Sequence, residues 1–185
     1  ANLTYGSFEH GPLFSVVFLL FDRTISCYYA ITGQGAWVRF HDGAKQVIAP
    51  ATTNDLRHAC VAAYVGRSGR LRSLAACETL IAHHQDESSF VNASGCYGFC
   101  LVAASQVDAF VEVAKGYRWH DIVSGAHILR EAGGTVRDLA FDDLRDPLSP
   151  RWLDSSPESA HAGLDAMSQA WAKVADPAPE QAPAN

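Results

Sequence analysis

The sequence is poor in charged residues and contains no cluster of Lys and Arg. Charged residues make up 18% of the chain, and 14 basic against 20 acidic residues leave a net charge of −6 with the histidines neutral. Proteins that bind nucleic acids depend on basic residues to neutralise phosphates. The composition therefore excludes a nucleic-acid-binding function.

The sequence also lacks a hydrophobic run long enough to cross a membrane. The longest apolar stretch, Pro12 to Phe21, has about ten residues and includes Ser15, whereas a transmembrane helix needs about 20. This stretch lies too far from Ala1, and follows no basic leader, to be a secretory signal. Because position 1 is Ala rather than Met, we expect that a segment has been removed upstream.

Cysteine is sparse and odd in number, and its spacing forms no disulfide framework. The five residues are Cys27, Cys60, Cys77, Cys96 and Cys100. This usage is typical of reduced thiols, so we expect a cytoplasmic or organelle-matrix location. Cys96 and Cys100 share one face of a helix, but no two further zinc ligands follow nearby, which favours packed thiols over a metal site.

The chain does contain enough apolar residues for one hydrophobic core. It has 185 residues, of which 48% are hydrophobic and 10% aromatic. This length and composition exclude disorder and a coiled coil and are typical of one globular domain. We expect a single domain over residues 1–175 and a flexible tail, rich in Pro and Ala, over 176–185.

The pattern of strands and turns predicts an α+β or layered α/β/α fold. Between residues 13 and 48, strand-like segments at 14–21, 24–31 and 36–40 are joined by turns too short for a parallel crossover, which predicts an antiparallel meander. After Pro50, strands and helices alternate. The strands are expected at 58–65, 88–92, 107–113 and 135–139, and the helices at 71–84, 121–132 and 156–174.

One segment, 119–138, combines an acid at a predicted helix start with a Gly pair at the helix end. Asp121 begins the helix, Gly125 would allow another backbone to approach, and Gly133-Gly134 would end the helix before a strand. An acid in this position is also an ordinary N-terminal helix cap. Spacing alone therefore leaves a structural and a functional interpretation of Asp121 open.

This segment resembles the second signature of the inositol monophosphatase family, in which Trp-Asp is followed by Gly and then by Glu-Ala-Gly-Gly. The ten-residue step from Asp121 to Glu131 fits that signature. The resemblance continues through residues 100–110 and through 11–40, where a Gly-x-Gly-Ala-aromatic turn occupies 33–37. It covers nearly the whole chain and implies a fold similar to the C-terminal part of that family's fold.

The resemblance implies a Mg²⁺-dependent hydrolysis of a small phosphate monoester. In that family, two or three magnesium ions held by carboxylates bind the phosphate and lower the pKa of the attacking water. By resemblance, Asp121 corresponds to a metal ligand, Glu112 to a contact with a substrate hydroxyl, and Ser94 to the hydroxyl of the substrate loop. No catalytic residue is assigned.

The sequence departs from the family pattern where most metal ligands should be. The loop Asp-Pro-x-Asp-Gly-Thr is absent, and residues 1–3 resemble those that directly follow it. His120 is inserted between Trp119 and Asp121, and Ala93 stands where Gly is expected. Because a single carboxylate holds Mg²⁺ weakly, two interpretations follow: a phosphatase whose hydrolysis is impaired or absent in this chain alone, or an inactive pseudoenzyme that serves as a structural or interaction subunit.

The apolar segment 14–21 predicts that the chain associates with a protein partner. In the fold that the resemblance implies, this strand is covered on both faces, and the missing N-terminal layer would leave one face exposed. Exposed apolar sheet surface promotes association. Besides the phosphate monoester, we therefore expect a second copy of the chain or another protein as a partner.

Overall fold

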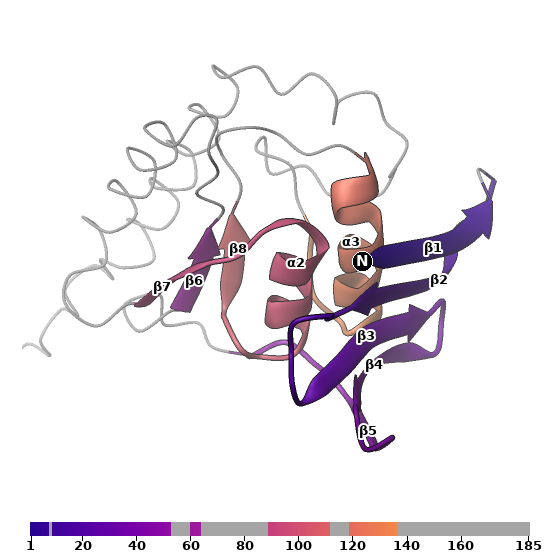
Figure 1. The fold of residues 1–185 in the computed structure, drawn as a ribbon. Helices are drawn as coiled ribbons and strands as arrows, with labels where there is room; N and C mark the ends of the chain where they lie inside the picture. The colour runs from indigo at the N-terminus through magenta and orange to yellow at the C-terminus, as the bar shows by residue number, and fades with distance from the viewer. Residues whose placement is uncertain (8, 53–59, 64–88, 112–118, 137–185) are drawn as a thin grey trace, which may run out of the picture.

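The computed structural model describes residues 1–7, 9–52, 60–63, 89–111 and 119–136 (Figure 1). A five-stranded antiparallel sheet has the order β1-β2-β3-β4-β5, and a three-stranded parallel sheet has the order β7-β6-β8. The elements are β1 (Asn2–Ser7), β2 (Gly11–Phe18), β3 (Ile25–Ile31), β4 (Gly35–Phe40), β5 (Lys45–Val47), β6 (Cys60–Ala63), β7 (Ser89–Asn92), α2 (Gly95–Ala103), β8 (Ala109–Val111) and α3 (Trp119–Glu131).

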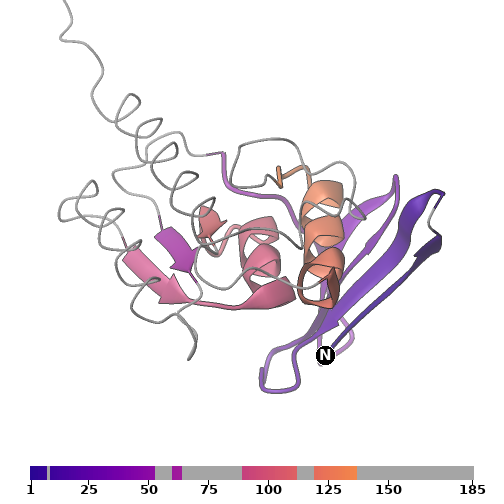
Figure 2. The same cartoon turned by 90° about the horizontal axis from the view of Figure 1, so that it is seen from above.

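The two helices lie between the two sheets. Figure 2 shows α3 against the five-stranded sheet, α2 beside α3, and the parallel strands beyond α2. The expected α+β layered architecture is therefore confirmed, including the antiparallel meander and the change to alternating strands and helices after Pro50.

Several element boundaries differ from those expected. The strand expected at 14–21 runs over Gly11–Phe18, because the chain then turns at Asp22, whose carboxylate accepts hydrogen bonds from the backbone N–H groups of Thr24 and Ile25. Strand β1 was not expected at all. Thr135 is not in a strand. The predicted helices at 71–84 and 156–174, the tail at 176–185 and most of the strand at 135–139 lie outside the described residues.

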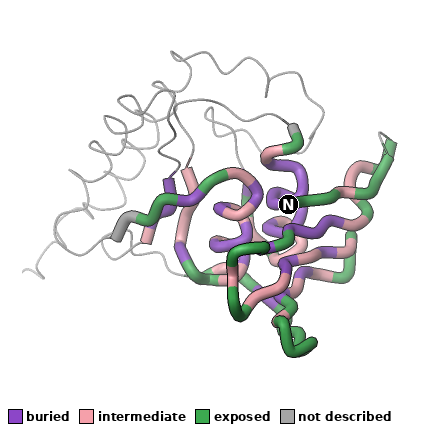
Figure 3. The backbone as a smooth tube through the Cα atoms, viewed as in Figure 1, coloured by how far each residue is buried: buried purple, intermediate pink, exposed green. Residues whose placement is uncertain are grey.

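The core lies between the helices and the inner face of the five-stranded sheet. Tyr28 and Ala30 of β3 are fully buried there, as is Ile128 of α3. Figure 3 shows buried stretches in both helices and in the strands of the five-stranded sheet. Alternate residues of each strand point inward, as the two-residue period of a strand requires. A smaller cluster packs under the parallel sheet and consists of Ala62, Ala93, Leu101 and Val107.

Helices α2 and α3 approach closely enough to require a glycine. A Cβ atom at Gly125 would lie 2.6 Å from the carbonyl oxygen and 2.7 Å from the Cα of Cys96. Backbone atoms cannot move aside as a flexible side chain can, so only glycine fits. The expectation that Gly125 admits a second backbone is thereby met, and the contact sets the position of α3 relative to α2.

The outer face of the five-stranded sheet carries several exposed apolar side chains, with Arg39 and Lys45 on the same face where β4 pairs with β5. The side chains that face away from α3 include Leu3 and Tyr5 of β1, Phe18 of β2 and Val47 of β5, which are 54%, 67%, 43% and 68% exposed. Among the described elements, both helices pack on the opposite face (Figure 2). Tyr29 and Trp37 stack on this outer face with ring centroids 5.2 Å apart, and we call the whole surface the outer apolar face.

Candidate functional site

The N-terminal ends of α2 and α3 meet, and two of the predicted site residues lie there. Gly95 begins α2 with φ of +53°, and a Cβ atom on it would lie 3.1 Å from the carbonyl oxygen of Asp121. Cys96 donates a hydrogen bond from Sγ to the same oxygen at 3.2 Å. Burial raises the pKa of the Cys96 thiol, which keeps it protonated as a donor. The structure thus brings Ser94, next to Gly95, close to Asp121.

Asp121 lies in the first turn of α3 rather than at its first residue, because the helix already begins at Trp119. Its side chain is 35% exposed, and its Oδ1 lies 3.5 Å from Nε2 of His120, whose side chain is 70% exposed. The His120 that the sequence inserts between Trp119 and Asp121 is thus an exposed neighbour of the Asp121 carboxylate. A negative charge in the first turn is also stabilised by the helix dipole.

Ser94 occupies the N-cap position of α2, but its hydroxyl makes no capping hydrogen bond, and the residue is exposed. A serine in this position normally bonds to the helix backbone. Here the exposed Ser94 lies at the start of α2, next to Gly95, which closely approaches the backbone of Asp121. Glu112, the other predicted substrate contact, lies outside the described residues, so its place relative to Ser94 stays a prediction.

The donor set within the described ranges does not complete a magnesium site. In that part of the chain, no three His, Cys, Asp or Glu side chains gather closely enough to hold a metal ion. Asp121 supplies one carboxylate, whereas Mg²⁺ requires an octahedron of oxygen ligands, of which carboxylates and phosphate oxygens are the usual members. Asp121 alone therefore does not explain how a magnesium ion would be held.

At the other end of α3, Glu131 acts as a clasp between the helix and the sheet. Its Oε2 accepts hydrogen bonds from the backbone N–H groups of Gly33 and Gly35, at 2.9 and 3.2 Å, although 98 and 96 residues separate them in the sequence. The two glycines form the turn between β3 and β4 and have φ of +73° and +105°. The Glu-Ala-Gly-Gly sequence and the Gly-x-Gly turn are thus one structural unit.

The Gly pair after Glu131 ends the helix with a Schellman motif. The N–H of Gly133 bonds to the carbonyl of Arg130, and that of Gly134 bonds to the carbonyl of Leu129, both at 2.9 Å. Gly133 has φ of +94°, which favours glycine. A Cβ on Gly134 would lie 2.2 Å from the Leu129 side chain. The prediction that this pair stops the helix is confirmed.

Ser15, His127 and Glu131 form an arrangement that superficially suggests a nucleophilic triad. Nδ1 of His127 lies 2.8 Å from Oγ of Ser15, and Nε2 lies 3.9 Å from Oε1 of Glu131. The Ser15 side chain is fully buried, however, and the distance from His127 to Glu131 is too long for a hydrogen bond. No substrate can reach this serine, so the arrangement is structural. Sequence reasoning missed it because its members come from segments far apart.

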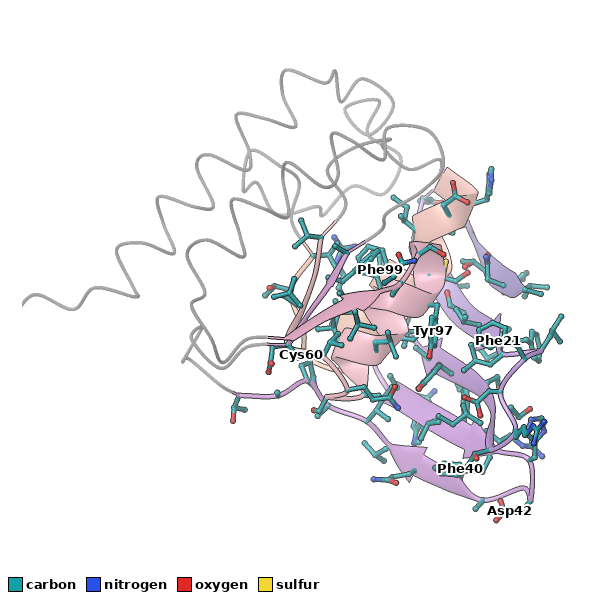
Figure 4. The ribbon with its side chains drawn as sticks, turned by 60° about the vertical axis from the view of Figure 1, so that its left-hand side comes forward. Phe21, Phe40, Asp42, Cys60, Tyr97 and Phe99 are labelled. Atoms are coloured by element: carbon teal, nitrogen blue, oxygen red, sulfur yellow. The ribbon has the colours of Figure 1, made fainter. Side chains whose placement is uncertain are left out.

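A hydrophobic contact links the hairpin between β2 and β3 to α2. Phe21 is 74% exposed, yet its ring meets that of Tyr97 edge to face with centroids 5.8 Å apart (Figure 4). The neighbouring Leu20 is 83% exposed. The end of the apolar segment noted in the sequence therefore lies in a turn. There Phe21 packs against Tyr97 of α2 instead of continuing the sheet.

A family-level sequence model, that of the inositol monophosphatase family, matches residues 4–172. The chain belongs to the inositol monophosphatase family. The match spans most of the chain and includes both the hairpins and α3, so the resemblance seen in the sequence is confirmed. A search of curated protein sequences gives no match.

Solved structures with the same fold support the assignment. SuhB from Mycobacterium tuberculosis is 30% identical over 66% of this chain with a TM-score of 0.54. SuhB from Bartonella henselae, with a TM-score of 0.60, and the inositol monophosphatase from Anabaena (Nostoc), with 0.55, are 18% and 20% identical over 83% and 82% of the chain. The matched region makes up 48%, 57% and 62% of these three proteins, so the chain spans less than two thirds of their length.

Two further findings concern membrane-spanning helices and the cysteines. In the described part of the chain, no helix combines the length and the hydropathy that a bilayer span requires. Cys27, Cys60, Cys96 and Cys100 are free thiols, as expected for a chain without a disulfide framework. The fifth residue, Cys77, lies outside the described residues.

Proposed function

We propose that this chain provides the phosphate-binding part of a magnesium-dependent phosphomonoesterase, and that hydrolysis by these 185 residues alone is impaired or absent. The observation that carries the proposal is the meeting of two helix N-termini, with Ser94 and Gly95 at one and Asp121 at the other. Backbone N–H groups and helix dipoles at such ends favour a bound phosphate. Family membership supports the same reaction class.

The metal requirement follows from the family, whose members depend on magnesium. Asp121 offers one carboxylate, and the described residues do not gather the further ligands that Mg²⁺ needs. The Asp-Pro-x-Asp-Gly-Thr loop is absent from the sequence. Additional ligands would have to come from undescribed residues or from another polypeptide, and for this reason no residue is assigned to the chemical step.

The binding half of the proposal is tested by NMR. Titration with inositol monophosphate should shift the backbone amides of Gly95, Cys96 and Ile122, because these lie at the two helix ends. The matched control is inositol, which lacks the phosphate and should leave the amides unmoved. Shifts confined to other parts of the protein, or equal shifts with inositol, would count against a phosphate site here.

The catalytic half is tested by phosphate release from inositol, fructose and nucleotide phosphates, with millimolar Mg²⁺ or with EDTA. The expected result is little or no turnover by the wild-type chain. Rapid, Mg²⁺-dependent release that Asp121→Asn abolishes would overturn the expectation that hydrolysis is impaired, and would mean that undescribed residues complete the metal site.

A second function, that of a structural or interaction subunit, is favoured by the outer apolar face. Leu3, Tyr5, Phe18 and Val47 are all exposed on this face, and exposed apolar side chains that gather on one surface are typical of interaction sites. We propose that a second copy of the chain, or another protein, covers this face. Size-exclusion chromatography with light scattering distinguishes the outcomes: a self-associated species is expected, whereas a monodisperse monomer of 20.0 kDa counts against a homo-oligomer. A reducing compartment, cytoplasm or organelle matrix, fits the free thiols.

A further inference from the structure

A chain of side-chain hydroxyls connects α3 to the first strand of the sheet. Nδ1 of His127 lies 2.8 Å from Oγ of Ser15, which lies 3.0 Å from Oγ1 of Thr4. The Thr4 oxygen is 2.7 Å from Oγ of Ser124, and the Ser124 hydroxyl is 3.3 Å from Oδ1 of Asn2. Ser15 and Ser124 are fully buried, so their hydroxyls cannot turn to water instead. Each hydroxyl has one proton to donate, which makes the chain directional.

The opposite edge of the imidazole ring determines where the ring carries its proton. Nε2 of His127 lies 3.0 Å from Oγ1 of Thr32. The Thr32 hydroxyl donates its only proton to the carbonyl oxygen of Pro12 at 2.5 Å. Since a carbonyl oxygen can only accept, Thr32 must accept from His127, and Nε2 must carry a proton.

For a neutral ring, this assignment sets the direction of every bond in the chain. With its single proton on Nε2, the ring accepts at Nδ1 from Ser15, Ser15 accepts from Thr4, and Thr4 accepts from Ser124. Ser124 must then accept from Asn2, which requires the amide nitrogen of Asn2 to face it. With Oδ1 facing Ser124 instead, the bonds run the other way, and both ring nitrogens must donate.

We infer that the hydroxyl chain has two directions and that the charge of His127 selects between them. When the ring is neutral, Asn2 donates through Nδ2 and the chain runs toward Nδ1 of His127. When a proton from solvent binds Nδ1, the ring donates at both nitrogens, the three hydroxyls rotate, and the Asn2 amide turns to accept through Oδ1. No covalent O–H bond breaks, because each hydroxyl keeps its own proton.

The surroundings of His127 allow both states. Burial of the ring lowers its pKa, the Glu131 carboxylate at 3.9 Å raises it, and Arg130 lowers it. Both charged groups belong to α3, while β1, β2 and the turn after β3 present the hydroxyls of Thr4, Ser15 and Thr32 to the network. Asn2 is exposed, so water satisfies whichever end of its amide faces outward. Protonation of the buried His127 ring is therefore coupled to the orientation of the Asn2 amide on the exposed edge strand β1.

The first test needs no variant and reads the position of the ring proton directly. Nitrogen-15 NMR of the whole protein with labelled histidines, titrated from about pH 8 down to about pH 5 around the ordinary His range, reports the proton on each ring nitrogen. His127→Gln assigns the resonance. At the high-pH end the proton is expected on Nε2. A neutral ring protonated on Nδ1 would overturn the inference.

The second test forces the hydrogen bonds of the hydroxyl chain to run in one direction. Asn2→Asp replaces the reversible amide with a group that only accepts, so it should raise the pKa of His127 by about half a unit to one unit, the size of one hydrogen bond gained. Asn2→Ser, which can still donate or accept, is the matched control and should leave the pKa unchanged. Adding Ser124→Ala breaks the chain and should remove most of the increase. An equal increase with and without Ser124→Ala would mean simple charge attraction and would overturn the inference.

Discussion

The two acidic residues of α3 lie at opposite ends of one helix and in opposite environments. The Asp121 side chain is 35% exposed and lies beside the exposed side chain of His120. The Glu131 side chain is 17% exposed and accepts two backbone hydrogen bonds from the turn between β3 and β4. Both acids belong to the same sequence signature. The comparison shows that Glu131 links α3 to the sheet, whereas Asp121 is the more exposed acid, and the ligand-binding role that we propose belongs to Asp121.

The close contact between α2 and α3 at Gly125 should give the largest effect on stability. Gly125→Ala places a methyl group 2.6 Å from the carbonyl oxygen of Cys96, so α2 and α3 must separate. We expect a loss of about 3 kcal/mol in the free energy of unfolding, measured by urea denaturation. The sign is informative, because Gly→Ala in an open helix stabilises by about 1 kcal/mol. A gain in stability would show that the helices are not held at this distance.

Glu131→Gln tests the clasp itself. The amide keeps the size of the side chain but removes the charge that strengthens the bonds to Gly33 and Gly35, so we expect a loss of about 2 kcal/mol. Urea denaturation measures it, and hydrogen exchange at the Gly33 and Gly35 amides should become faster. Unchanged exchange at these amides would mean that the clasp does not hold the turn.

The helix end beside the clasp should give a somewhat smaller effect. Gly133 has φ of +94°, and Ala in this conformation costs about 1–2 kcal/mol. Nothing lies within 4 Å of a Cβ atom there, so the loss is conformational rather than steric. Gly133→Asn is the matched control and should lose less, because Asn tolerates the left-handed region better. Equal losses for Ala and Asn would argue against this explanation.

The effect of pH should be smaller still. Burial lowers the pKa of His127 below its ordinary value of 6.5, so the folded protein binds this proton less readily than the unfolded chain. The contribution of the neutral ring is therefore present above about pH 6.5 and is lost as the pH falls toward the folded pKa. Thermal unfolding from pH 8 to pH 5 should show a steeper loss in the wild type than in His127→Gln. Parallel curves would contradict this account.

Much of the fold follows from local patterns in the sequence. The meander, α3 and its Gly pair are encoded by strand alternation, helical periodicity and turn residues, all of which act over a few positions. Strand β1 was missed because its inward residues, Asn2 and Thr4, are polar and bond to Ser124 and Ser15 rather than to an apolar core.

The candidate site was only partly predictable for a different reason. Asp121 was found through the family signature and Ser94 through the resemblance to the substrate loop. The clasp from Glu131 to Gly33, however, joins residues 98 apart, and the bond from His127 to Ser15 spans 112. Neither pairing can be recognised from the local sequence pattern. A sequence motif therefore indicates that both acids of α3 matter, while only the fold shows that Glu131 has a structural role and that Asp121 lies in the more exposed position of the proposed site.

The most direct test of this separation compares Asp121→Asn with Glu131→Gln in one pair of measurements, urea denaturation and the NMR titration with inositol monophosphate. Asp121→Asn should change the free energy of unfolding by no more than about 1 kcal/mol, the size of the helix-dipole contribution of its charge, yet alter the ligand-induced amide shifts at Gly95 and Ile122. Glu131→Gln should lose stability and keep those shifts. If both variants lose stability equally, or if Glu131→Gln alone abolishes the shifts, the division of roles along α3 is wrong.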